Sequence, residues 1–89
     1  MKTKKYNVYA DPGHAWAKVK FSELLKLGIH DKISQFSYTR GDSVYLEEDC
    51  DLSVFVDALL KIGIKPYWVQ HHTNKSSKIR SYMHYIPTI

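Results

Sequence analysis

The 89-residue chain contains one cysteine, Cys50, and only four glycines and three prolines. A single cysteine excludes an internal disulfide and a zinc site built on paired cysteines, and it fits a reducing compartment. No apolar run approaches the roughly 20 residues that a membrane helix needs. The basic start is followed by Tyr6 and Asn7 rather than by the apolar stretch of a secretory signal. We therefore expect a cytoplasmic protein with no membrane partner.

Acidic residues are missing from the last third of the chain, although the whole chain has nine of them and a net charge of +4. No acid follows Asp57, while several cations do: Lys61, Lys65, Lys75, Lys78 and Arg80. Six of the acids lie in one block: Asp42, Glu47, Glu48, Asp49, Asp51 and Asp57. Such blocks can neutralise one another on folding or leave two faces of opposite sign.

Recognisable catalytic motifs are also missing. The sequence has no glycine-rich phosphate loop, no GxSxG elbow and no HExxH helix. We expect no cofactor and no metal site. A binding protein is favoured over an enzyme.

The residues that are present predict alternating strands and helices. Period-two alternation predicts strands, and an apolar stripe at i, i+3, i+4, i+7 and i+8 from Leu52 predicts a helix that Asp51 caps. Ser22 is expected to cap a shorter helix. The expected strands are 6–10, 15–20, 33–39, 43–47, 67–72 and 78–85, and the expected helices are 23–27 and 52–62.

This order, ββαββαββ, predicts one α+β domain over residues 1–89. We expect a mostly antiparallel sheet of five or six strands with both helices on one face. The other face should carry aromatic side chains such as Tyr9, Trp16, Tyr45 and Trp68. Some of these should be partly exposed or covered by a partner. Residues 22–29 resemble residues 57–64 at an offset of 35, and Val8-Tyr9 resembles Val44-Tyr45, which leaves an internal duplication open.

The first candidate site is the turn Asp11-Pro12-Gly13-His14. A carboxylate that orients an imidazole is the basis of general acid–base chemistry. The simpler interpretation is that Asp11 caps its own turn and that His14 is merely exposed. If this turn, the acidic block and Arg80 converge, Arg80 is expected to pair with one of the carboxylates.

The second candidate is the acidic run Glu47-Glu48-Asp49-Cys50-Asp51 at the end of the strand 43–47, with Asp42 nearby. Hard cations prefer several oxygen ligands, but alternate residues of a strand point to opposite faces, and no EF-hand spacing is present. Asp51 and Asp49 are interpreted as favouring the positive end of the long helix, and the rest of the run is interpreted as solvated. Glu47, Glu48 and Asp49 could instead form an acidic edge that faces a basic protein partner.

The third candidate is a basic, hydroxyl-rich segment that follows His71 and His72. Lysine and arginine neutralise phosphates, and aromatic rings on a sheet stack bases, so the segment could bind nucleic acid or a protein partner. The residues predicted for this surface are Trp16, Trp68, Lys75, Lys78, Arg80 and Tyr82. A solubilising loop over cross-strand aromatic pairs is an equal alternative.

The runs YADPGHAWAKV, SYTRGDSVYLEEDCD and HHTNKSSKIRSY, in this order, resemble small uncharacterised proteins of bacteriophages and mobile elements. The resemblance implies a viral protein acting in the cytoplasm of a bacterial host, and it assigns no role to any residue. Our first hypothesis is a binder that inhibits or redirects a host protein complex, an anti-CRISPR-like role included. The alternatives are a nucleic-acid-binding module and a small metal-assisted enzyme using Asp11 and His14, with Glu48 as a further ligand.

Overall fold

The protein is described by a computed structural model that covers residues 1–87. The strands are β1 (Lys2–Ala10), β2 (Ala15–Lys20), β3 (Tyr38–Arg40), β4 (Ser43–Glu47), β5 (Ile64–His72) and β6 (Met83–His84). The helices are α1 (Phe21–Leu27) and α2 (Leu52–Lys61), with short 3₁₀ turns η1 (His30–Lys32) and η2 (Lys78–Ser81). The predicted α+β order is confirmed. Within residues 1–87, no helix is long and apolar enough to cross a membrane.

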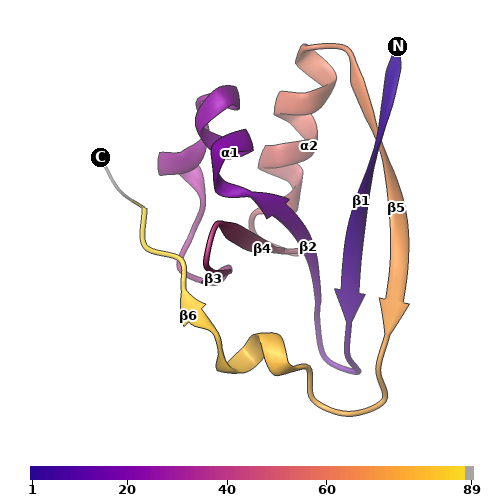
Figure 1. The fold of residues 1–89 in the computed structure, drawn as a ribbon, viewed down its shortest axis with the longest axis vertical. Helices are drawn as coiled ribbons and strands as arrows, with labels where there is room; N and C mark the ends of the chain where they lie inside the picture. The colour runs from indigo at the N-terminus through magenta and orange to yellow at the C-terminus, as the bar shows by residue number, and fades with distance from the viewer. Residues whose placement is uncertain (88–89) are drawn as a thin grey trace.

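All six strands form one mixed sheet in the order β5-β1-β2-β4-β3-β6 (Figure 1). Four of the neighbouring pairs are antiparallel, and only β1 and β5 are parallel. The parallel pair arises because β5 follows α2, which carries the chain across one face of the sheet before it returns beside β1. The mostly antiparallel sheet that the sequence predicts is therefore present.

Both helices cover one face of the sheet, as predicted (Figure 1). Phe55 and Leu59 of α2 and Leu24 of α1 are fully buried there. They pack against alternate residues of β1, β2 and β4, because every second side chain of a strand points to the same face. The strand residues of this core are Tyr6, Val19, Val44 and Leu46.

The opposite face is covered in part by the chain itself. Trp16 and Tyr45 are buried there against Ile79 of η2, with Tyr82 at the edge of the cluster. The prediction that Trp16 belongs to a binding surface is wrong, since only 2% of it is accessible. Trp68 was expected on this face as well, but it packs against Tyr6 on the helix side, with ring centroids 5.9 Å apart.

Two predicted strands are shorter than expected. The segment 33–39 becomes a strand only at Tyr38, because Ser34 and Ser37 donate hydrogen bonds to the Asp51 carboxylate instead of joining a ladder. The segment 78–85 begins as η2, since the Ser77 hydroxyl accepts a hydrogen bond from the backbone N–H of Ile79 and caps a 3₁₀ turn. Side-chain hydrogen bonds of serine and aspartate compete with strand pairing in both places.

The suspected duplication is limited to the helix ends. Gly28 after α1 and Gly63 after α2 both have positive φ, of 71° and 78°, which explains the shared glycine. The resemblance of Val8-Tyr9 to Val44-Tyr45 is not matched by equivalent positions in the fold. Val8 lies in β1, with β2 between it and α1, whereas Val44 lies in β4, the strand just before α2.

Candidate functional site

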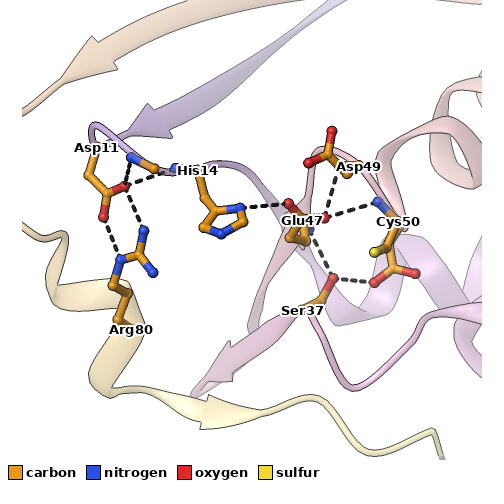
Figure 2. A network of polar contacts seen from close by, with 9 residues as sticks. Asp11, His14, Ser37, Glu47, Asp49, Cys50 and Arg80 are labelled. Carbon is orange, nitrogen blue, oxygen red and sulfur yellow. Dashed lines mark hydrogen bonds and ion pairs between the residues drawn. The ribbon is translucent and has the colours of Figure 1, made fainter.

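Polar side chains from three distant parts of the chain meet at one corner of the sheet (Figure 2). The β1–β2 turn contributes Asp11 and His14, the end of β4 contributes Glu47 and Asp49, and η2 contributes Arg80. Asp11 and Glu47 are buried, which is costly for carboxylates unless donors surround them. The turn, the acidic block and Arg80 therefore converge.

Asp11 is held by a bidentate ion pair with Arg80. Nε of Arg80 donates to Oδ2 at 2.6 Å and Nη2 donates to Oδ1 at 2.8 Å. The backbone N–H groups of Ser77, Gly13 and His14 also donate to this carboxylate. The Arg80 guanidinium, followed by the Ser77 N–H, holds the pKa of the Asp11 carboxyl far below its usual value of 3.8. The predicted arginine–carboxylate pair and the turn-capping role of Asp11 are both confirmed.

The pairing ties the C-terminal segment to the rest of the sheet. Asp11 and Arg80 are 69 positions apart in the chain. The Arg80 guanidinium also lies over the Trp16 ring, 5.3 Å from its centroid. Asp11 is thus a structural anchor rather than a partner that orients the His14 ring.

The carboxylate beside the His14 ring is that of Glu47, whereas the sequence suggested Asp11. Nδ1 of His14 lies 3.2 Å from Oε1 of Glu47, and the backbone N–H groups of Asp49 and Cys50 donate to Oε2 at 2.9 and 3.0 Å. These three contacts allow a carboxylate with 5% accessibility at the end of β4. The interpretation of the acidic run as solvated is wrong for Glu47, while Glu48 and Asp49 are exposed.

Behind Glu47, a second buried carboxylate fixes the loop before β3. Asp51 precedes α2, as predicted, but its side chain makes no capping bond to the helix. It accepts hydrogen bonds from the hydroxyls of Ser34 and Ser37, at 2.8 and 2.5 Å. The Ser37 hydroxyl in turn accepts one from the backbone N–H of Glu47. This network fixes the position of the Glu47 backbone. The sequence pattern did not single out Ser37.

The side chains of His14, Glu47 and Asp49 form a possible metal-ligand set. One ligand atom from each residue lies within 4.8 Å of the other two. Ligand atoms bound about 2.0 to 2.2 Å from a tetrahedral dication lie about 3.3 to 3.6 Å apart. Any pair of these atoms near the 4.8 Å limit therefore has to approach by about 1 Å for all three to bind one ion. The sequence analysis left open whether the His14 turn and the acidic block converge. They meet because β4 ends at Glu47 and the following turn brings Asp49 to the same side.

These residues line a pocket of about 290 Å³ together with Trp16, Phe36, Tyr38, Cys50 and Arg80. The buried indole N–H of Trp16 has no hydrogen-bond partner in the described part of the chain. Desolvation and the Glu47 carboxylate raise the pKa of the Cys50 thiol, although the residue as a whole is exposed. Cys50 is thus a poor candidate for a thiolate nucleophile.

The other predicted binding residues do not form one surface. Lys75 and Lys78 are exposed in and after the loop that follows β5. Tyr82 packs against Tyr45, with ring centroids 5.2 Å apart, and lies on the face opposite Trp68. Arg80 is committed to Asp11.

Comparisons with known proteins identify no relative. No family model, no curated protein and no solved structure matches this chain.

Proposed function

We propose that the protein binds a divalent first-row transition-metal ion through His14, Glu47 and Asp49, and that the ion holds an anionic group of a ligand in the adjoining pocket. One imidazole nitrogen and two carboxylates suit Zn²⁺, Mn²⁺ or Fe²⁺ better than Ca²⁺, which prefers six to eight oxygen ligands. Three protein ligands leave coordination positions open for water or for the ligand.

The state of Asp49 is the observation that carries the proposal. Its carboxylate has no hydrogen-bond or ion-pair partner among residues 1–87, yet it lies beside the buried Glu47 carboxylate. Asp49 is exposed to solvent, and a bound cation would relieve the repulsion between its charge and that of Glu47. The backbone donors to Oε2 of Glu47 leave Oε1 directed at His14, which is how an outer shell orients a metal ligand.

The pocket favours an anionic ligand. A bound dication balances the charges of Glu47 and Asp49, and Arg80 adds a cation whose own charge Asp11 balances. The Nε and Nη2 donors of Arg80 bind Asp11, which leaves the Nη1 donors without a described partner. Carboxylate and phosphate groups match these donors.

Calorimetric titration with Zn²⁺, Mn²⁺ and Mg²⁺ tests the proposal. We expect one ion per chain, tighter binding of Zn²⁺ and Mn²⁺ than of Mg²⁺, and a loss of at least about tenfold in affinity for Asp49→Asn and for His14→Gln. Affinity should also fall in acid, because protons compete for the same ligands.

Two neighbouring substitutions are matched controls. Glu48→Gln removes an exposed acid next to Asp49, and His72→Gln removes an exposed imidazole outside the cluster. Both should bind the metal as the unmodified protein does. Equal losses in Glu48→Gln and Asp49→Asn would mean that the acidic run attracts cations without forming a site, and the proposal would fail.

The sequence-based hypothesis of a host protein complex as partner stays a prediction, and the exposed Glu48 and Asp49 remain available to a basic surface. Metal-assisted catalysis with Asp11 as a reacting group is not part of the proposal, because Asp11 is already bonded to Arg80 and to three backbone N–H groups.

A further inference from the structure

A second surface, away from the polar corner, is strongly basic. The three strands β5, β1 and β2 contain six lysines and no acidic residue: Lys2, Lys4, Lys5, Lys18, Lys20 and Lys65. These strands are neighbours in the sheet, and alternation along them places four of the lysines on the face away from the helices: Lys5, Lys18, Lys20 and Lys65. Lys4 points to the helix side, where it pairs with Glu23 of α1. The positive charge of β1 and β2 is therefore not neutralised by acidic residues in the same strands.

A cleft opens within this basic region. The β1–β2 ladder runs only from Ala10↔Ala15 to Asn7↔Lys18, whereas β1 continues along β5 as far as Lys2. Beyond Asn7 the two strands separate, as Figure 1 shows, and α1 closes one side of the gap. The cleft has a volume of about 770 Å³, and five lysines line it: Lys4, Lys5, Lys18, Lys20 and Lys26.

Only part of this positive charge is balanced. Glu23 accepts a hydrogen bond from Lys4 at 3.1 Å and another from the Tyr6 hydroxyl at 2.5 Å. Asp42 lies 3.8 Å from Lys20 in a fully exposed pair, which contributes little. Three of the lining lysines have no carboxylate partner within the described residues: Lys5, Lys18 and Lys26.

Aromatic rings lie beside these lysines on the sheet face away from the helices. Tyr67 of β5 is opposite Lys5 in the parallel register, and 55% of it is exposed. Further along the same face, Tyr9 and His71 stack with ring centroids 4.9 Å apart and an interplanar angle of 16°. Exposed rings next to unpaired lysines match the two parts of a nucleotide, a flat base and an anionic phosphate.

We propose that single-stranded nucleic acid binds across this face, with its phosphates at Lys5, Lys18 and Lys20 and a base stacked on Tyr67. An unpaired strand is the occupant that the geometry favours, since the bases of a duplex are stacked on each other and cannot reach the Tyr67 ring. The surface is separate from the metal corner. Along β2, Lys18 lies about 10 Å and Lys20 about 17 Å from Ala15, the residue that follows His14.

Fluorescence anisotropy with a labelled twelve-nucleotide oligothymidylate, in buffer with a metal chelator, tests this inference independently of the metal site. We expect binding that weakens steeply with salt, as counterion release requires. Lys5→Glu/Lys18→Glu should lower the affinity more than about tenfold and flatten the salt dependence. Tyr67→Ala should lower it roughly tenfold with little change in salt dependence, because the ring carries no charge.

The matched control is Lys75→Glu/Lys78→Glu, which makes the same charge change in the loop region that the sequence favoured. It should bind nearly as the unmodified protein does apart from a small nonspecific loss, and circular dichroism should show that both double variants remain folded. Three results would overturn the inference: no binding at low salt, a larger loss for the loop variant than for Lys5→Glu/Lys18→Glu, or tighter binding of a duplex that is insensitive to Tyr67→Ala.

Discussion

The two faces of the sheet are held together by different forces. On the helix side, Phe55, Leu59 and Leu24 are completely buried and stabilise the fold by the removal of apolar surface from water. On the other side, Asp11 and Arg80 close the chain over Trp16 with directional charge-assisted hydrogen bonds. The first side resembles an ordinary core, and the second is where every candidate ligand group of the polar corner lies.

This contrast between the two faces shows which of them can hold polar functional groups without loss of stability. An apolar core tolerates many combinations of side chains of similar total volume. Such packing therefore does not fix where a polar group lies. The polar corner places His14 against Glu47, 33 positions away, only because both ends are fixed by their own hydrogen bonds. Substitutions on the two faces should therefore differ in size and in their dependence on pH.

The largest effect is expected from Phe55→Ala on the helix side. Removing a fully buried ring that also makes an edge-on contact with Tyr6, at 5.2 Å between centroids, should lower the free energy of unfolding by about 3–5 kcal/mol. Urea denaturation followed by circular dichroism measures it. Leu60→Ala, at a position with 44% exposure on the same helix, should cost clearly less. Equal costs would mean that α2 packs differently.

A smaller effect is expected from Arg80→Met on the other side. The substitution keeps an aliphatic stem over Trp16 but leaves the buried Asp11 carboxylate without its ion-pair partner. Thermal unfolding should show a lower midpoint, by less than for Phe55→Ala. In a double-mutant cycle with Asp11→Asn, the two losses should not add, because both remove the same pair. Additive losses would contradict the pairing.

Acid should weaken the second face selectively. The pKa of Asp11 is lowered on folding, so its contribution is fully present above the usual value of 3.8 and is lost progressively as the pH falls below it. Unfolding by urea at pH 5 and at lower pH should show a stability loss that is reduced in Asp11→Asn. An unchanged acid dependence in Asp11→Asn would indicate that other carboxylates account for the loss.

The smallest effect is expected from Gly13→Ala. A Cβ at this position would lie 2.8 Å from Nη2 of Arg80, which is the end of a flexible side chain that can move aside. We expect the thermal midpoint to fall slightly and the acid dependence to weaken in the same direction as for Asp11→Asn. A midpoint loss as large as that of Arg80→Met would show that the guanidinium is fixed more rigidly than this comparison assumes.

Local sequence patterns were enough to predict the repeating order of strands and helices. Period-two alternation and the stripe from Leu52 to Leu60 are local patterns, and the two glycines after the helices mark their ends through positive φ. The same local patterns indicated that Asp11 belongs to a turn. They failed for 33–39 and 78–85, where serine hydroxyls and distant carboxylates compete with strand pairing.

Which polar groups meet at the corner of the sheet could be read only from the three-dimensional fold. The burial of Glu47, the alignment of Asp49 beside His14 and the side of the sheet that Trp68 occupies depend on strand order and on the parallel return of β5. The physical reason is that a strand's pattern specifies which residues share a face, whereas the neighbour across that face is set by chain crossings far away in sequence.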